Sequence, residues 1–246
     1  MLPQSGIEVV VTRDSPDSAA VKALAEILSE NERQRADRFV MERDRWRFVM
    51  RRARLRKLLG ERLGVSGASV RLSTGIHGKP ALDVPFDRSG ITFSLSHSGD
   101  LIVYAFASHA DVGIDVEAIR LIDDADRLAA IAFSALELEI YERLTPENKL
   151  IGFLNCWTRK EALVKATGAG LCQSLDSFDV SLAPDEPARL LRLGAIRGNA
   201  GWSMYGFCPA PGFIAAIAAR GQHDDRESRV QKESRRLRRP FVPCQG

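Results

Sequence analysis

Two acidic side chains, Asp115 and Glu117, stand in the strand-like stretch Val112–Glu117. Side chains alternate between the two faces of a β-strand, so these carboxylates are expected to point the same way, about 7 Å apart along the strand. Two carboxylates on one face repel each other unless a cation lies between them, and a hard divalent ion such as Mg²⁺ prefers oxygen ligands. A solvated edge of a sheet explains the pair equally well at this point.

A third acid, Glu161, precedes Lys165 by four residues. This spacing places a carboxylate and an ammonium on one face of a helix. The same order is also the favoured arrangement of a surface ion pair, which is worth only about 0.2–0.5 kcal/mol. The surface pair is the simpler interpretation of these two residues alone.

Two turns add further candidates. The alternating stretch Ile91–Gly99 ends in a polar turn that contains Ser96 and His97, and Lys79 precedes Pro80 in a glycine-rich loop. A lone histidine in a turn is usually structural, and a lone lysine is usually solvated. No order of serine, histidine and aspartate suggests a hydrolytic triad. The sequence also lacks the P-loop, zinc-protease and dinucleotide-binding motifs.

Together these residues suggest phosphoryl transfer. Three carboxylates could hold a metal ion that neutralises charge developing on phosphate oxygens, and nearby lysine, histidine and arginine could hold the leaving group. Transferase, nuclease and phosphatase chemistry all remain open on the residues alone.

The periodicity of apolar residues predicts the elements that position these groups. Helices are expected at Ser18–Leu28, Ser29–Phe39, Asp44–Leu63, Asp123–Ala132, Ser134–Leu144 and Asn148–Thr167. Strands are expected at Ile7–Val11, Val70–Thr74, Ile91–Gly99, Leu101–Ala107, Val112–Glu117, Phe178–Leu182, Ala188–Leu193, Trp202–Phe207 and Phe213–Ala219. Since the order lacks a run of βαβ units, the predicted class is α+β.

The composition, 45% hydrophobic and 27% charged residues in 246, is that of an ordinary globular protein. Four scattered cysteines and an N-terminus without a signal peptide favour a reducing cytoplasm. The uncharged stretch Gly198–Ala219 contains prolines and repeated glycines, so it predicts a buried hairpin and not a membrane helix. We therefore expect a cytoplasmic protein with no membrane partner.

Basic residues gather in two places. Residues 221–246 hold seven Arg or Lys against four acids, which accounts for the whole net charge of +3, and this aperiodic segment is predicted to be a disordered tail. Arg33–Arg62 holds twelve basic residues against four acids. Such a block can bind phosphates, an acidic partner or nucleic acid, or it can be a solvated helix face.

Four motifs occur in order: Gly78–Pro80, Phe93–Ser98, Gly113–Glu117 and Trp157–Lys165. In this combination the chain resembles the 4′-phosphopantetheinyl transferases, and more narrowly their surfactin-synthetase-activating type. The resemblance runs from about Arg33 to Val180. It includes the lesser matches Ala132–Ser134 and Gly168–Leu171.

The resemblance implies a monomer of two similar α+β subdomains related by a pseudo-twofold axis, with the active site in the cleft between them. The expected ranges are 1–117, 118–220 and the basic tail 221–246. The implied reaction transfers the phosphopantetheine arm of coenzyme A to a serine of an apo acyl or peptidyl carrier protein and releases adenosine 3′,5′-bisphosphate. An acidic carrier helix would suit the basic block. The pathway that the carrier serves stays open.

The resemblance also assigns residues. Mg²⁺ would be held by Asp115, Glu117 and Glu161, and whether Mn²⁺ can replace it is open. Glu161 would take the proton of the acceptor serine, directly or through water, and Lys165 would stabilise the leaving phosphate. Contacts with coenzyme A are expected from Arg47, Lys79, Pro80, Ser96, His97, Asp115 and Lys165.

Three positions depart from the family pattern. Ser94 stands where asparagine is frequent, which we expect to change only a local turn hydrogen bond. Glu32 stands where a basic phosphate contact is frequent, so that contact either falls to Arg35 or is missing. Val116 offers no metal ligand, so water molecules would complete the octahedral coordination of the metal ion.

Two other functions fit parts of the sequence. A metal-dependent phosphodiesterase or nuclease also uses scattered acids, but its lysine normally follows an acid by two residues, where this chain has Ile119. A nucleic-acid-binding module could use the arginine-rich helix and the tail. Few aromatic residues interleave with those arginines, however, so base stacking would be poorly served.

Overall fold

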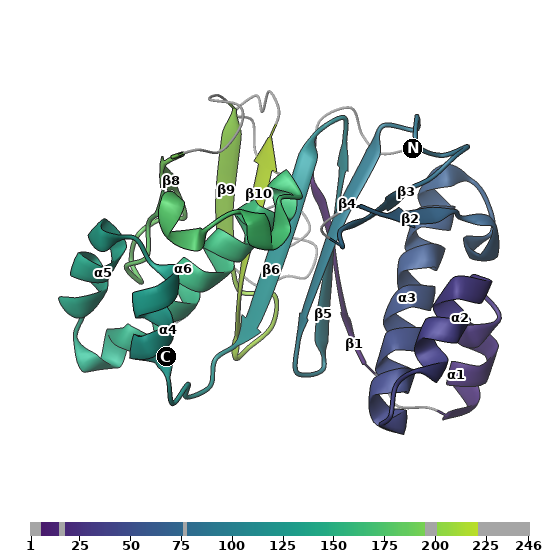
Figure 1. Cartoon of the computed structure of the whole chain (residues 1–246), viewed down its shortest axis with the longest axis horizontal. Coiled ribbons are helices and arrows are strands. Elements are labelled where there is room, and N and C mark those ends of the chain that lie inside the picture. The colour runs from purple at the N-terminus through teal and green to yellow at the C-terminus, as the bar shows by residue number, and fades with distance from the viewer. Residues whose placement is uncertain (1–5, 15–17, 76–77, 195–200, 221–246) are drawn as a thin grey trace.

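The computed structural model describes residues 6–14, 18–75, 78–194 and 201–220. Two three-stranded antiparallel sheets pack against each other at its centre (Figure 1). The first has the order β1-β5-β4, with β1 at Glu8–Arg13, β5 at Leu101–Ser108 and β4 at Ile91–Ser98. The second has the order β6-β10-β9, with β6 at Asp111–Ala118, β10 at Phe213–Arg220 and β9 at Trp202–Phe207. The predicted α+β class is confirmed.

Helices flank the two sheets on opposite sides (Figure 1). Helix α3 (Glu42–Leu63) covers the first sheet, and α1 (Ser18–Ala25) and α2 (Glu30–Asp37) pack on α3. Helix α6 (Pro146–Thr167) covers the second sheet, and α4 (Ala125–Ala132) and α5 (Ala135–Glu142) pack on α6. Single 3₁₀ turns lie at Gly67–Ser69, Gly170–Cys172 and Leu175–Ser177. Two short ribbons pair β2 (Leu72–Thr74) with β3 (Pro80–Leu82) and β7 (Asp179–Val180) with β8 (Leu190–Arg192).

Each predicted helix and strand is present, with ends that shift by a few residues. One prediction is wrong: the loop expected at residues 75–82 ends in a strand, β3, in which the Leu82 side chain is buried. The predicted disordered tail lies outside the described residues. The subdomain boundary expected after residue 117 stays a prediction, although β6 pairs with β10 and so belongs to the second sheet.

Strand β5 is apolar from Leu101 to Ala107, apart from the hydroxyl of Tyr104, because both of its faces are buried. Ile102, Tyr104 and Phe106 pack in one core with Leu55, Leu58 and Leu59 of α3. The alternate residues, Leu101, Val103, Ala105 and Ala107, pack in a second core with Val112, Ile114 and Val116 of β6. The two sheets are therefore joined by a shared apolar layer.

Three alternate serines of β4 join the two sheets along their neighbouring edges. Ser94 Oγ accepts a hydrogen bond from the Ile114 backbone N–H at 3.2 Å, and Ser98 Oγ accepts one from the Ala118 N–H at 3.0 Å. Between them, Ser96 Oγ donates to Asp115 Oδ1 at 2.7 Å. The expectation that Ser94 affects only a local turn is wrong, because its side chain links β4 to β6.

Gly113 allows α6 to lie directly on β6. A Cβ atom at this position would lie 2.0 Å from the carbonyl oxygen of Ala162 and 2.3 Å from the backbone N of Ala166. These are backbone atoms of a helix, so they cannot move aside as the end of a flexible side chain can. Gly113, two residues before Asp115, therefore sets the distance between strand and helix.

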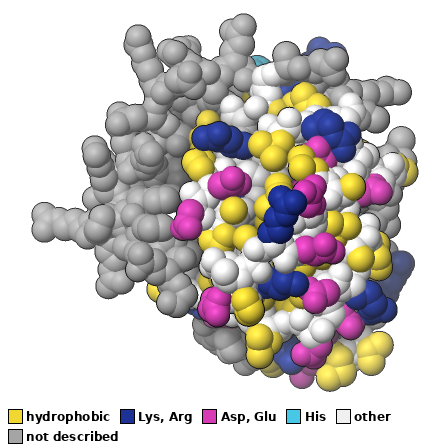
Figure 2. Space-filling view, turned by 90° about the vertical axis from the view of Figure 1, so that its left-hand side faces the viewer, with side chains coloured by type: hydrophobic (Ala, Val, Ile, Leu, Met, Phe, Trp, Pro, Cys, Tyr) yellow, Lys and Arg dark blue, Asp and Glu magenta, His cyan; other side chains and the backbone are white. Residues whose placement is uncertain are grey.

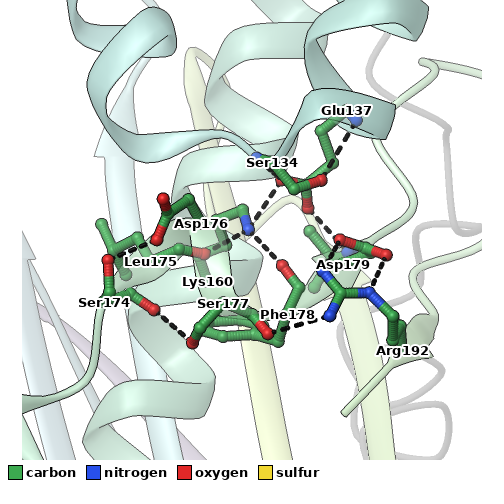
Figure 3. Close-up of polar contacts among 11 residues, drawn as sticks. Ser134, Glu137, Lys160, Ser174, Leu175, Asp176, Ser177, Phe178, Asp179 and Arg192 are labelled. Atoms are coloured by element: carbon green, nitrogen blue, oxygen red, sulfur yellow. Dashed lines mark hydrogen bonds and ion pairs between the residues drawn. The ribbon is translucent and has the colours of Figure 1, made fainter. Parts of the chain in front are cut away.

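A buried ion pair fixes the other side of α6 (Figure 3). The Lys160 ammonium lies 2.7 Å from Glu137 Oε2 and donates to the carbonyl oxygens of Leu175 and Phe178, each at 2.6 Å. Three acceptors use all three N–H groups of the lysine, and both charged side chains are completely buried. Glu137 also forms the predicted capping box with Ser134. This network ties α5, α6 and the segment after α6 together.

Replacing Gly113 with alanine should push α6 away from β6. We expect Gly113→Ala to lower the free energy of unfolding by about 1–3 kcal/mol, as overpacked core substitutions do. Urea denaturation measures the change. Gly6→Ala is the matched control, because a Cβ there would meet no atom within 4 Å. Equal stability of the two variants would contradict the proposed close contact.

Candidate active site between β6 and α6

Asp115 and Glu117 point from β6 toward α6. Their alternate neighbours Ile114 and Val116 are buried in the core between the sheets, so the two carboxylates share the opposite face. Both line a pocket of about 420 Å³ together with Glu161 and Lys165 of α6. The predicted common orientation is confirmed, and the helix adds the third acid and the lysine to the same pocket.

Lys165 is bound directly to Asp115, one of the two acids of β6. Its Nζ donates to Asp115 Oδ1 at 2.6 Å and to Ser96 Oγ at 3.0 Å. Asp115 is 4% exposed, and its second oxygen, Oδ2, is buried without a hydrogen-bond partner among the described residues. The spacing of Glu161 and Lys165 therefore does not serve a surface ion pair between the two, because the lysine contacts a carboxylate of another element.

Among the described residues, no cation contacts the other two acids, Glu117 and Glu161. Glu117 Oε2 accepts a hydrogen bond from Ser98 Oγ at 2.8 Å. Burial raises the pKa of Glu117, and the charge of Asp115 raises it further, against the hydrogen bond from Ser98. Burial likewise raises the pKa of Glu161, with Asp115 and Glu117 adding to the shift and Lys165 opposing it. The pocket thus holds more negative charge than its own cation balances.

The donor set fits a hard divalent cation. The pocket offers carboxylate oxygens, one of which is buried without a hydrogen-bond partner among the described residues. Because the pKa values of Glu117 and Glu161 are raised, a positive charge near these carboxylates would stabilise their ionised forms. As the side chains lie, no three acidic, histidine or cysteine residues in the described part of the chain form a ready-made metal site. Assignment of Asp115, Glu117 and Glu161 as ligands therefore stays a prediction.

The acidic pocket opens into a cavity of about 1310 Å³, because His97, Glu117, Glu161 and Lys165 line both. The cavity wall is strongly basic. Its cationic residues come from both halves of the chain: Arg35, Arg47, Arg51, Arg52, Lys79, Arg120 and Lys165. Such a cavity can hold a ligand that carries several phosphates.

The predicted ligand contacts fall around this cavity. Arg47, Lys79, Pro80 and His97 line it, while Ser96 lines the smaller acidic pocket. The Lys79 ammonium, however, donates to the carbonyl oxygens of Val112 and Ala166, each at 3.2 Å. This lysine links β6 to the end of α6, and a phosphate would have to share it with those two carbonyls.

His97 lies at the mouth of the acidic pocket. Burial among its neighbours lowers the pKa of the imidazole, and the charges of Arg51 and Lys165 lower it further. Both cations line the large cavity with it. These effects favour the neutral form of the ring, whereas an incoming anion would favour its protonation.

The arginine block divides into structural and cavity-lining residues. Arg56 is 2% exposed and lies 2.6 Å from Glu32, which also pairs with Arg52 at 3.1 Å. Glu32 thus serves the packing of α2 on α3, which explains an acid at a position where the family often has a base. Arg35 lines the cavity, as its predicted substitute role requires.

Ser98 and Arg51 belong to the site but are not among the residues predicted for it. Ser98 hydrogen-bonds Glu117, and Arg51 lines the cavity from α3. The alternation of serines along Ile91–Ser98 was a signal for the first, because alternate residues of a strand share a face. Nothing distinguished Arg51 from the other arginines of its helix.

The face that carries α4 and α5 has charges of both signs interspersed with apolar groups (Figure 2). Two ion pairs of α4 and α5 are Arg127–Asp124 at 2.9 Å and Arg143–Glu139 at 2.6 Å. A continuous basic surface for nucleic acid does not occur on this face as far as the described residues go. No described helix has the length and apolar character needed to cross a membrane.

Comparison with known proteins identifies relatives over most of the chain. Residues 111–206 match a family model described as the 4′-phosphopantetheinyl transferase superfamily, and residues 13–109 match one described as 4′-phosphopantetheinyl transferase, N-terminal. The chain is 38% identical over 208 residues to the 4′-phosphopantetheinyl transferase HetI of Nostoc sp. (strain PCC 7120), covering 85% of this chain and 84% of the relative. It is 33% identical to psf-1 of Bacillus pumilus, covering 69% and 70% of the two chains. Against Sfp of Bacillus subtilis (strain 168) it is 29% identical, covering 64% and 68%.

The raised pKa of Glu161 predicts a specific pH dependence of stability. A carboxyl group whose pKa is higher in the folded than in the unfolded protein destabilises the fold when it is ionised. The free energy of unfolding of the wild type therefore falls as the pH rises through the folded pKa of Glu161. Without divalent cations, Glu161→Gln should unfold at a higher temperature than the wild type above that pKa, and the difference should vanish below about pH 4.3, the unfolded value.

Thermal unfolding followed by circular dichroism from pH 4 to pH 8, with chelator, measures this difference. The exposed Glu139→Gln on α5 is the control and should show no such trend. A Glu161→Gln variant that is less stable than the wild type at pH 8 would contradict the interpretation.

Proposed function

The chain belongs to the 4′-phosphopantetheinyl transferase superfamily, and we propose that it transfers the phosphopantetheine arm of coenzyme A to a serine hydroxyl of an apo acyl or peptidyl carrier protein. Adenosine 3′,5′-bisphosphate is the product that leaves. The observation that carries the proposal is the acidic pocket of β6 and α6, which opens into a basic cavity large enough for a nucleotide with three phosphates. No observation favours the nuclease or the nucleic-acid-binding alternative.

Asp115, Glu117 and Glu161 would hold Mg²⁺, which supplies charge neutralisation at the phosphate oxygens. The buried, partnerless Oδ2 of Asp115 and the charge excess of the pocket support this assignment. Ser96 and Ser98 keep Asp115 and Glu117 in place by hydrogen bonds of 2.7 and 2.8 Å.

Glu161 is proposed to take the proton from the acceptor serine, directly or through one water molecule. Glu161 lines both the acidic pocket and the basic cavity, so it can reach a hydroxyl group that enters between them. The serine oxygen then bonds to the phosphorus that carries the pantetheine arm, and the bond from that phosphorus to the oxygen of the adenosine bisphosphate breaks. Charge accumulates on the departing phosphate oxygen.

Lys165 is proposed to stabilise that oxygen. Its ammonium contacts Asp115 and Ser96, and it lines both the acidic pocket and the basic cavity. It can therefore reach a phosphate between the two. His97 and Arg47, on the same cavity, would bind phosphate oxygens without taking part in bond breaking.

Mass spectrometry of apo carrier proteins incubated with the enzyme, coenzyme A and Mg²⁺ tests the proposal. The expected result is a mass gain of one phosphopantetheine group on a single serine. Asp115→Ala and Glu161→Ala should each lower the rate at least about 100-fold, since several kcal/mol of charge stabilisation are lost, while both proteins stay folded. Near-normal rates in both variants would overturn the metal and base assignments.

His97→Ala should act mainly on binding. We expect KM for coenzyme A to rise about tenfold, the effect of losing one hydrogen bond to a charged group, while kcat stays within about twofold. Steady-state kinetics with saturating carrier protein separate the two constants. A large fall in kcat at unchanged KM would show that the histidine takes part in the chemistry instead.

A further inference from the structure

We propose that Arg51 is a further phosphate-binding residue of the basic cavity and that Asp14 is the residue that positions it. This inference rests on the proposed function, since the phosphates are those of coenzyme A. Asp14 directly follows β1, and Arg51 lies in the middle of α3, so the pair joins two elements of the first half of the chain.

The Arg51 guanidinium is held on one side only. Its Nε and Nη2 donate to Asp14 Oδ2 at 3.1 and 2.6 Å. A guanidinium has five N–H donors, and the described residues offer no further acceptor to this one. The side chain is 14% exposed and lines the cavity. The remaining donors are therefore available to an anion in the cavity.

Asp14 is built into the fold as a fixed anchor. Its side chain is 7% exposed, and its backbone N–H donates to the carbonyl oxygen of Asp100 at 2.7 Å, which ties it to the turn between β4 and β5. The backbone carbonyl of Arg51 accepts a hydrogen bond from the Tyr104 hydroxyl at 3.1 Å. Both ends of the ion pair are thus attached to the first sheet.

One carboxylate serves two guanidinium groups at this position. Arg47 Nε lies 3.8 Å from the same Asp14 oxygen that Arg51 contacts. The pair of arginines therefore keeps a surplus positive charge beside the cavity. Arg51 also lies close enough to His97 to lower the pKa of that ring, although burial is the larger cause. Two arginines and a histidine then surround one part of the cavity wall.

The arginines that follow Arg51 on α3 differ from it in their partners or in their exposure. Arg56 is buried against Glu32, and Arg62 contacts Glu8 at 2.6 Å. Arg52 lines the cavity but is paired with Glu32, and Arg54 is exposed and does not line it. Arg51 combines a fixed position, free donors and access to the cavity.

Isothermal titration of the purified protein with coenzyme A, without carrier protein, tests the inference. Arg51→Gln should weaken binding about tenfold or more, the usual effect of losing a hydrogen bond to a charged group. Arg51→Lys should recover only part of the affinity, because an ammonium lacks the fork of donors. Arg54→Gln removes the same charge from the same helix and should leave binding and transfer unchanged.

Asp14→Asn separates positioning from simple neutralisation. Removing a negative charge beside the cavity should strengthen anion binding if Asp14 only neutralises Arg51. If Asp14 positions Arg51, binding should weaken and KM for coenzyme A should rise while kcat changes little, and Asp14→Glu should restore part of the loss. Thermal unfolding of each variant verifies that the fold is retained.

Unchanged or tighter binding in both Arg51→Gln and Asp14→Asn would overturn the inference while the wild type still binds coenzyme A and modifies a carrier protein. Failure of the wild type to bind coenzyme A would instead overturn the proposed function. The two results are distinguished by the wild-type titration, which is performed first.

Discussion

The close approach of α6 to β6 is the constraint on which the candidate site depends. Gly113 permits it, because any larger residue would place a Cβ inside the helix backbone. The contact brings Glu161 and Lys165 into the pocket that contains Asp115 and Glu117. The buried Lys160–Glu137 pair holds the helix from its other side. The positions of these four charged residues thus depend on the absence of a side chain at Gly113 and on the buried Lys160–Glu137 ion pair.

The electrostatics of the site follow from that geometry. Three carboxylates and one lysine share a partly buried pocket, and the lysine contacts Asp115 alone among the acids. The pKa values of Glu117 and Glu161 are raised because burial and like charges both disfavour ionisation. Burial and like charge therefore favour a cation between these carboxylates, and a bound cation would in turn lower the pKa values of the residues that hold it.

The arginine-rich helix shows that a charge block need not have one purpose. Arg56 forms an ion pair with Glu32 that stabilises the packing of α2 on α3. Arg47 and Arg51 instead share the buried Asp14 and line the cavity. Two three-stranded sheets provide the frame for both groups, because β5 is buried on both faces and carries α3 on one of them. The two groups of arginines differ in where the fold places their acidic partners, and the composition of the helix does not reveal this.

The sequence alone determined the class, the elements and the face on which the acids lie, because strand alternation and helical periodicity are local properties. Asp115 and Glu117 share a face as their spacing requires, and the capping box of Ser134 and Glu137 forms as its residues predict. Only the tertiary structure decided that Lys165 pairs with Asp115, that Ser94 joins two sheets and that Lys79 bonds two carbonyls. These contacts span between 20 and 87 positions of the chain, and they depend on how whole elements pack.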